Sequence, residues 1–360
     1  MSVRKASCFS LLYNSRVNRF ASLLLEYYDK NKRPLPWRMN PTPYQVWVSE
    51  IMLQQTRIET VKTRYLSFLE AFPSVEALAL ASEEQVLKEW EGLGYYTRAR
   101  NLRKGAMMVA ERFHGELPRT KAELLMIPGI GEYVSSAISS IAFNQPEIAL
   151  DGNLFRVYAR INLVEKRYED TKAKKEAIQF YKKEMPKERC GDFNEALMEL
   201  GETLCLPNGK PLCESCPLSA LCKAHQEKKE LTVPLSKITK EKRHVSLNVV
   251  LVIWNGNVLI HRRESKGLLA GTYEFPNCPR DSGIEPLLEE LNADGPASFL
   301  GNSKHVFSHL EWDMNWYEVK CEKKPFLSGC ILVSFADLKD AYMLPNAFTK
   351  FCKNHAILGF

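Results

Sequence analysis

Two carboxyl groups occupy positions where an acidic residue is unexpected. Glu50 lies in the otherwise uncharged run 47–56, and Asp151 follows two apolar residues at the start of a predicted helix. A carboxyl group in apolar surroundings has a raised pKa and can act as a general acid, whereas a better-solvated carboxylate stays ionised and can stabilise positive charge. Such a pair fits cleavage of a glycosidic C–N bond through an oxocarbenium-like state. A buried ion pair at Glu50 and a helix N-cap at Asp151 are the alternatives.

Four of the ten cysteines are clustered in the segment 205–222, with the pattern Cys205-x7-Cys213-x2-Cys216-x5-Cys222. Four thiolates this close, in a chain whose other cysteines are scattered, indicate a metal site in a reducing compartment. The site could hold tetrahedral zinc or a cubane iron–sulfur cluster, and spacing alone does not separate the two; a chance grouping of buried thiols is the third reading. We expect a structural role in preference to redox chemistry.

A tight turn is predicted at Gly129-Ile130-Gly131, between two segments of helical periodicity. Two glycines on either side of an apolar residue let backbone N–H groups point outward at the start of the next helix, where they can bind a phosphate oxygen. This pattern is typical of a helix–hairpin–helix that grips the DNA backbone without reading its sequence. An ordinary helical hairpin with glycine caps is the alternative.

The elements that must position these residues change character once along the chain. Residues 15–204 show helical periodicity interrupted by proline turns, so we predict an all-α domain over 1–225 that ends with the cysteine loop 205–222. Residues 226–243 have the charged, weakly periodic composition of a linker. Residues 244–360 are predicted to form an α+β domain that begins with a hairpin turning at Asn255-Gly256.

Composition excludes several classes of protein. The 360 residues are 45% hydrophobic and 26% charged, which rules out wholesale disorder, and no apolar run is long enough to span a membrane. The net charge of +6 divides into +8 for residues 1–243 and −2 for residues 244–360, and a basic front suggests a polyanionic partner. With no secretory signal in view, we expect a bacterial cytoplasmic, nucleoid-associated protein.

The motifs together resemble the MutY-type adenine DNA glycosylases of the helix–hairpin–helix superfamily. The resemblance covers roughly residues 17–350, and its motifs follow in order: Leu35–Arg38, Ser49–Thr56, Gly92–Tyr96, Ile127–Gly131 and Leu150–Asn153. It implies that the cysteine loop holds a [4Fe–4S] cluster and that the C-terminal domain is Nudix-like. The expected fold is therefore a helix–hairpin–helix glycosylase domain with a cluster loop, joined to a Nudix-like α+β domain.

The resemblance also implies a role for each matching residue. Glu50 would protonate the adenine and assist the attacking water, and Asp151 would stabilise the sugar cation, with Tyr133 and Asn153 holding the two carboxylates. The implied substrate-binding residues are Arg33, Trp37, Arg38 and Glu195 in the adenine pocket, Gln55, Thr56, Leu93 and Tyr95 at the duplex, and Phe307, Ser308 and His309 in the loop that inspects 8-oxoguanine. The adenine must be flipped out of the stack before its glycosidic bond can be reached.

Position 133 separates two reaction classes of the superfamily. Endonuclease III has at this point a lysine that forms a Schiff base with the sugar. This chain has Tyr133, and no lysine lies between Lys121 and Lys166, so a monofunctional glycosylase is expected.

Three features depart from the family pattern. The first cysteine gap is seven residues where the family usually has six, and Phe155 stands where some relatives have a lysine that base removal does not need. The C-terminal domain lacks the acidic Nudix signature, so we expect it to read bases without hydrolysing pyrophosphates.

The sequence therefore predicts a monomeric base-excision-repair enzyme that acts on double-stranded DNA and removes adenine opposite 8-oxoguanine or guanine. The alternatives are an endonuclease III-like glycosylase/lyase for oxidised pyrimidines and a non-catalytic DNA-binding iron–sulfur protein. Tyr133 disfavours the first alternative. The presence of both acids disfavours the second, because a pure DNA binder does not need two unpaired carboxylates near phosphates.

Overall fold

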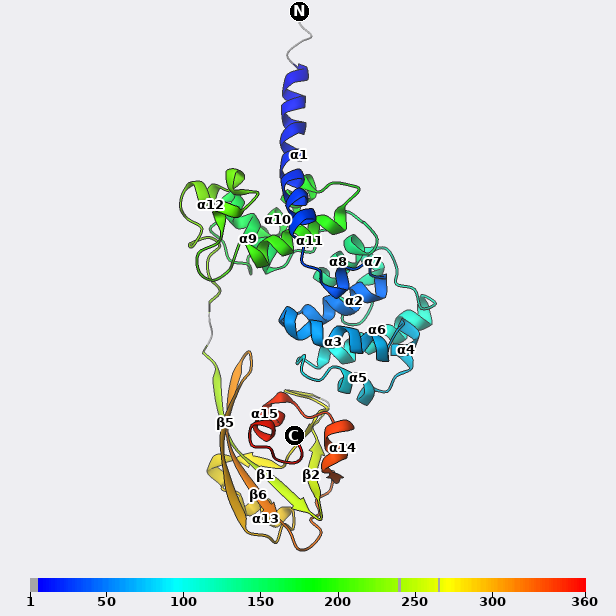
Figure 1. Cartoon of the computed structure of the whole chain (residues 1–360), viewed down its shortest axis with the longest axis vertical. Coiled ribbons are helices and arrows are strands. Elements are labelled where there is room, and N and C mark those ends of the chain that lie inside the picture. Colours follow the sequence, from blue (N-terminus) through cyan, green and yellow to red (C-terminus); the bar gives the residue numbers. More distant parts are fainter. Residues whose placement is uncertain (1–5, 239–240, 265) are drawn as a thin grey trace, which may run out of the picture. The chain divides into compact units, whose positions relative to one another are not determined.

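A computed structural model describes residues 6–238, 241–264 and 266–360, with side chains from residue 19 onward. The chain divides into two compact units (Figure 1). The first unit comprises residues 1–80 and 104–238, and the second comprises residues 81–103 and 239–360. None of the helices in the described ranges is long and apolar enough to cross a membrane.

The first unit is helical. Its helices in chain order are α1 (Ala6–Asn31), α2 (Pro43–Leu53), α3 (Ile58–Ala71), α4 (Val75–Leu80), the larger part of α6 (Thr97–Arg112), α7 (Lys121–Leu124), α8 (Glu132–Ile141), α9 (Gly152–Asn162), α10 (Thr171–Glu184), α11 (Cys190–Thr203) and α12 (Lys223–Gln226). Short 3-10 turns lie at Pro36–Arg38, Cys213–Ser215 and Ser219–Leu221. The predicted helical character of this part of the chain is confirmed.

Local sequence fixes the starts of the two helices that carry the catalytic candidates. Helix α2 begins with a capping box, in which the side chain of Thr42 accepts from the backbone of Gln45 and the Gln45 side chain accepts from the backbone of Thr42. Pro43 at its first position suits the helix start. Helix α9 is capped by Asp151, whose side chain accepts from the Leu154 backbone N–H. The N-cap expected of Asp151 is therefore present.

Helices α1, α9, α10 and α11 pack around one apolar core. Phe155, Tyr181 and Phe193 are each at most 1% exposed at its centre. Phe193 and Tyr181 meet edge to face with ring centroids 6.2 Å apart, the geometry that aromatic pairs favour. This core holds the start of α9 and the middle of α11 in fixed positions, and both carry site residues.

The second unit contains a seven-stranded mixed sheet. Its strands are β1 (Arg243–Trp254), β2 (Asn257–Arg262), β3 (Tyr273–Glu274), β4 (Asn277–Pro279), β5 (Ala297–Val306), β6 (Leu310–Lys320) and β7 (Cys330–Ser334). The main order is β3-β2-β1-β6-β5, with β4 paired to β1 and β7 to β2. Strands β1 and β6 run parallel along their whole length. The helices of the unit are α5 (Glu83–Glu89), α13 (Glu285–Glu290), α14 (Phe335–Asp340) and α15 (Asn346–Asn354).

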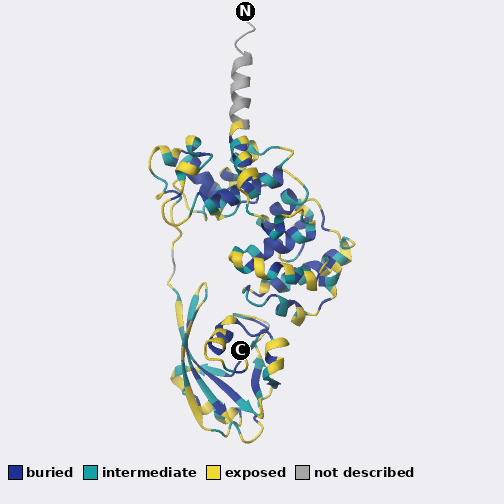
Figure 2. Cartoon of the chain, in the orientation of Figure 1, coloured by how far each residue is buried: buried dark blue, intermediate teal, exposed yellow. Residues whose placement is uncertain are grey.

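Residues 248–252 in the middle of strand β1 are buried (Figure 2). Val249 and Leu251 belong to one core, beneath α15, and Val250 and Val252 belong to another, which includes residues flanking α13. Because successive side chains of a strand point to opposite faces, this alternation gives the sheet two separate cores. It explains why residues 249–254 of β1 form an uninterrupted apolar run instead of alternating with polar residues.

The predicted hairpin is confirmed. Strands β1 and β2 are antiparallel, and the turn residues Asn255 and Gly256 have φ values of 47° and 71°. The α+β character of the C-terminal part is confirmed as well. The predicted domain bounds of 1–225, 226–243 and 244–360 stay a prediction, and the grouping of residues 81–103 with the second unit was not expected from the sequence.

Candidate active site and metal centre

A cavity of about 530 Å³ in the first unit brings together residues from six separate segments of the chain. Nine of the predicted site residues line it: Trp37, Arg38, Glu50, Gln55, Thr56, Tyr133, Asp151, Asn153 and Glu195. The cavity is also lined by apolar side chains such as Leu35 and Ile58. A partly apolar cavity with a few convergent polar groups is the usual form of a small-ligand or base pocket.

Glu50 lies on α2 and is buried, with 6% of its surface exposed. Its Oε2 atom has no hydrogen-bond partner among the described residues. Burial raises the pKa of Glu50 to about 7, a hydrogen bond with Tyr133 lowers it, and the charges of Glu195 and Asp151 raise it further. Glu50 is thus a carboxyl group that holds a proton near neutral pH and has one oxygen free to deliver it.

Asp151 is partly exposed, and both of its oxygens are bonded. Its Oδ1 accepts from the backbone N–H of Leu154 at 2.7 Å, and its Oδ2 accepts from the Asn153 amide at 2.9 Å. Burial raises the pKa of Asp151, and these hydrogen bonds together with the charge of Arg156 lower it. On balance the pKa of Asp151 is raised, but donors to both of its oxygens stabilise its ionised form, whereas Oε2 of Glu50 has no donor among the described residues.

Arg38 and Glu195 line the cavity, and Arg38 is bonded to Glu199, a residue that does not line the cavity and that the sequence analysis missed. Arg38 Nη1 lies 2.7 Å from Glu199 Oε2, and its Nε lies 3.5 Å from Glu195 Oε1. The hydroxyl of Tyr28 donates to Glu195 Oε2 at 2.8 Å. Burial raises the pKa of Glu195, whereas the hydrogen bonds from Arg33 and Arg38 outweigh burial and lower the pKa of Glu199.

Arg33 does not line the cavity, in contrast to the expectation for an adenine-pocket residue. Its Nε donates to Glu199 Oε1 at 2.6 Å, and a further amino group donates to Glu202. Of these two carboxylates, Glu202 lines the cavity and Glu199 does not. Arg33 supports Arg38 through the shared partner Glu199. The spacing of Glu195 and Glu199, four residues apart on α11, was the signal that could have identified Glu199.

The predicted phosphate-binding turn joins α7 to α8. Gly129 has φ 84°, which favours glycine, and Gly131 caps the start of α8. A Cβ atom at Gly131 would meet no other atom within 4 Å, so the backbone is open at this point. The geometry agrees with the helix–hairpin–helix expected from the sequence.

The remaining predicted substrate-binding residues, those expected to contact the duplex and the 8-oxoguanine, lie in the second unit. Leu93, Tyr95, Phe307, Ser308 and His309 all line a cavity of about 570 Å³ in that unit. Ser308 and His309 follow the end of β5, and their side chains lie 3.3 Å apart. The structure therefore groups these five residues apart from the nine that line the cavity of the first unit.

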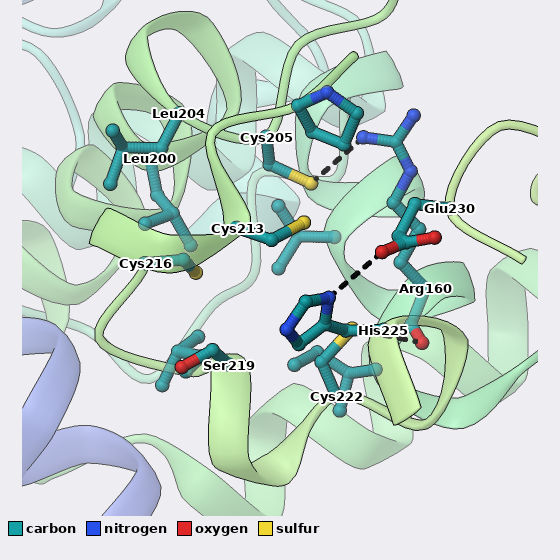
Figure 3. A pocket seen from close by; sticks show the side chains of 14 residues that line it. Arg160, Leu200, Leu204, Cys205, Cys213, Cys216, Ser219, Cys222, His225 and Glu230 are labelled. Carbon is teal, nitrogen blue, oxygen red and sulfur yellow. Dashed lines mark hydrogen bonds and ion pairs between the residues drawn. The ribbon is translucent and has the colours of Figure 1, made fainter. Parts of the chain in front are cut away.

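The four clustered cysteines line a third cavity, whose walls are the apolar side chains of α9 and α11 (Figure 3). All four thiols are free, so no disulfide competes for their sulfur atoms. Arg160, which is 5% exposed, donates to the sulfur of Cys205 at 3.2 Å. Four free thiols therefore surround one apolar cavity, and the buried guanidinium of Arg160 contacts one of them. This arrangement fits a metal group bound by four thiolates, whose negative charge a buried cation would balance. His225 and Glu230 also line the cavity and were not predicted.

Comparisons with known proteins agree with this geometry. The HhH-GPD superfamily of base excision DNA repair proteins matches residues 48–183, and the NUDIX domain family matches residues 248–354. The adenine DNA glycosylase of Rattus norvegicus is 32% identical over 368 residues, covering 85% of this chain and 71% of the rat protein. The chain belongs to the adenine DNA glycosylase family. As a member of that family it is a DNA glycosylase of base excision repair that removes adenine.

Solved structures share the helical fold of this adenine DNA glycosylase. A thermostable thymine-DNA glycosylase superposes with a TM-score of 0.53 at 27% identity, covering 60% of this chain and 99% of its own. An endonuclease III bound to DNA superposes with a TM-score of 0.51 at 23% identity, covering 59% of this chain and 97% of its own. The expected architecture, a helix–hairpin–helix glycosylase domain with a C-terminal Nudix-like domain, is thus confirmed.

Proposed function

We propose that the enzyme is a monofunctional glycosylase that removes adenine opposite 8-oxoguanine or guanine and leaves an abasic site. The observation that carries this proposal is the unpartnered Oε2 atom of buried Glu50, in the same cavity as the hydrogen-bonded carboxylate of Asp151. The two acids differ in environment in the way that an acid and a charge stabiliser require.

In the proposed reaction, Glu50 gives its proton to the flipped adenine. The C–N bond to the sugar then breaks, its electron pair leaves with the base, and positive charge develops on the sugar. Asp151, kept ionised by Asn153 and Leu154, stabilises that charge. Glu50, now ionised, takes a proton from the water that attacks the sugar, which restores the enzyme.

Nothing in this cavity supports the lyase alternative. None of the described residues that line it is a lysine, and Tyr133 occupies the position that a Schiff-base lysine has in endonuclease III. A tyrosine hydroxyl cannot form an imine with the sugar. Tyr133 instead hydrogen-bonds Glu50. The second alternative, a silent DNA binder, does not explain why one oxygen of a buried carboxyl group, Oε2 of Glu50, has no hydrogen-bond partner among the described residues.

We assign adenine binding to the wall of the cavity formed by Trp37, Arg38 and Glu195. Trp37 is buried and contributes an apolar surface, while Arg38 and Glu195 offer a donor and an acceptor. Gln55 and Thr56 lie at the same cavity. Leu93, Tyr95 and the loop residues Phe307, Ser308 and His309 would contact the strand that carries 8-oxoguanine.

The proposed partner is double-stranded DNA with an 8-oxoguanine·adenine or guanine·adenine mispair, bound by a monomer in the bacterial cytoplasm. The turn Gly129–Gly131 would bind backbone phosphate through its N–H groups. A [4Fe–4S] cluster would be bound by Cys205, Cys213, Cys216 and Cys222. We expect this cluster to stabilise the conformation of the loop 205–222. Arg160 would offset the negative charge of the cysteine thiolates that bind the cluster.

Two measurements on one preparation test the proposal. Purified enzyme is incubated with duplexes that contain 8-oxoguanine·adenine, guanine·adenine or thymine glycol, with and without borohydride. We expect free adenine from the first two duplexes, no strand nicking and no trapped complex. Efficient trapping on any duplex, or release of the oxidised pyrimidine in place of adenine, would reject the monofunctional mechanism.

A further inference from the structure

The cavity of the cysteines contains two donor groups beyond the four sulfurs. His225 lies on α12, and Glu230 follows this helix. The sulfur of Cys213, a ring nitrogen of His225 and a carboxylate oxygen of Glu230 all lie within 4.8 Å of one another. One metal ion can bridge a sulfur and an imidazole nitrogen at such a separation. The cavity therefore offers more potential ligands than a four-ligand cluster needs.

The imidazole of His225 is oriented by a carboxylate. Its Nδ1 lies 2.8 Å from Oε1 of Glu230 (Figure 3). Because a carboxylate only accepts, Nδ1 carries the hydrogen, and Nε2 of the neutral ring keeps its lone pair. A carboxylate that fixes one ring nitrogen while the other stays available is the arrangement of histidines that bind metals.

Cys213 is the cysteine that directly follows the first gap of the cysteine pattern, the seven residues 206–212, which is one residue longer than is usual in the family. It follows directly on the loop 206–212, in which Gly209 has φ 75° and Leu212 bonds back to Leu204 at 2.9 Å. Cys205, by contrast, lies two residues after the end of α11, where its backbone N–H donates to Leu200 at 2.8 Å and its sulfur accepts from Arg160. A ligand on an extended loop is the one that can most readily leave the iron.

We propose that His225 is an alternative ligand to the iron that Cys213 binds. In the exchange the bond from iron to the Cys213 sulfur breaks and a bond from iron to Nε2 of His225 forms. No electron is transferred, and the released thiolate takes a proton from water. The inference rests on the proposed [4Fe–4S] cluster, and Glu230 is its positioning residue because it orients the ring.

The test compares alanine variants at two cysteines. Wild type, Cys213→Ala, Cys216→Ala and the double variant Cys213→Ala/His225→Leu are purified without oxygen and analysed for iron, sulfide and visible absorbance. Alanine offers no ligand, so a cluster that persists in Cys213→Ala has its fourth ligand from another residue or from solvent, and the double variant separates these two cases. We expect that variant to keep most of its iron, and Cys216→Ala and the double variant to keep about tenfold less. Pulsed electron paramagnetic resonance of reduced Cys213→Ala should show a coupled histidine nitrogen that the wild type lacks.

Equal loss of iron in Cys213→Ala and Cys216→Ala would overturn the inference while leaving the glycosylase proposal intact. A wild type that contains zinc, or no metal, would reject the [4Fe–4S] proposal and the inference with it. If circular dichroism shows that Cys213→Ala does not fold, the test is the rate at which a chelator removes iron from His225→Leu and from wild type. We expect about tenfold faster release from His225→Leu, and equal rates would contradict the inference.

Discussion

The side-chain amide of Asn153 donates a 2.9 Å hydrogen bond to Oδ2 of Asp151. This bond occupies the one carboxylate oxygen that the helix N-cap leaves open, because Oδ1 is already bonded to the Leu154 backbone. It lowers the pKa of Asp151 against the effect of burial. Asn153 therefore helps to keep Asp151 charged beside a cavity where Glu50 is protonated.

Removing this bond should weaken catalysis through Asp151. In Asn153→Ala the pKa of Asp151 rises further, so we expect kcat to fall about tenfold or more and the acid limb of the pH profile to move to higher pH. Single-turnover adenine release between pH 5 and 8 measures both effects. Asn162→Ala, at the far end of α9, is the control and should leave the profile unchanged. An unshifted acid limb in Asn153→Ala would contradict the role given to this bond.

The pH dependence of wild type should follow Glu50. Its pKa is raised to about 7, and the protonated form is the acid, so the rate should decline as pH rises through about 7. In Tyr133→Phe the hydrogen bond that lowers this pKa is lost, and the decline should move to higher pH. The pH–rate profiles of the two proteins give the shift directly. A decline at the same or lower pH in Tyr133→Phe would show that Tyr133 does not tune Glu50.

The same carboxyl group should lower stability at alkaline pH. Because the folded-state pKa of Glu50 lies above its unfolded value, the native state binds the proton more tightly, and stability falls as pH rises from about 4.5 to about 7. Glu50→Gln removes this penalty. We expect it to raise the free energy of unfolding by about 1–3 kcal/mol at pH 8 and to change it little at pH 4.5. Urea unfolding at both pH values tests this, with the exposed Glu59→Gln as control.

Glu199 should be the most costly acid of the site to remove. Its side chain is fully buried and bonded to two arginines, Arg33 and Arg38. Glu199→Ala leaves Arg38 buried without its nearest partner, so we expect a loss of about 3 kcal/mol in unfolding free energy. Glu202→Ala removes a carboxylate from Arg33 at a position that is one third exposed, and should cost less than about 1 kcal/mol. Similar losses in the two variants would refute the ranking.

The loop after β5 should set the preference for the opposite base. We expect Ser308→Ala/His309→Ala to lower the ratio of the rate of adenine release from 8-oxoguanine·adenine to that from guanine·adenine, because the hydrogen bonds that we propose for these two side chains to the oxidised base are lost. The control is Ser298→Ala, an exposed serine on β5. An unchanged ratio would contradict the proposal that this loop recognises 8-oxoguanine.

Much of the site could be predicted because its signals are local. Glu50 interrupts an uncharged run, and Asp151 caps a helix, so each can be recognised as a candidate from a few neighbouring residues of the sequence. The turn at Asn255-Gly256 is equally local, since it depends on two residues that tolerate positive φ. The motif resemblance added further site residues, and the cavity in the first unit contains nine of the residues predicted for the site.

Contacts between distant segments could not be predicted in this way. Glu199 meets Arg33 across 166 positions of sequence, and no pattern in either segment shows which buried acid will meet which arginine. The parallel pairing of β1 with β6 depends on the sheet as a whole. His225 and Glu230 were missed because neither belongs to the cysteine spacing. Long-range pairs of this kind depend on packing, which periodicity does not encode.

The central claim is that Glu50 supplies the proton for adenine release. The most direct test is single-turnover release of adenine from an 8-oxoguanine·adenine duplex by wild type and Glu50→Gln, with binding to the same duplex measured in parallel. The account predicts that Glu50→Gln binds the duplex as tightly as wild type and releases no adenine above background. Release at a rate near that of wild type, with binding intact, would contradict it.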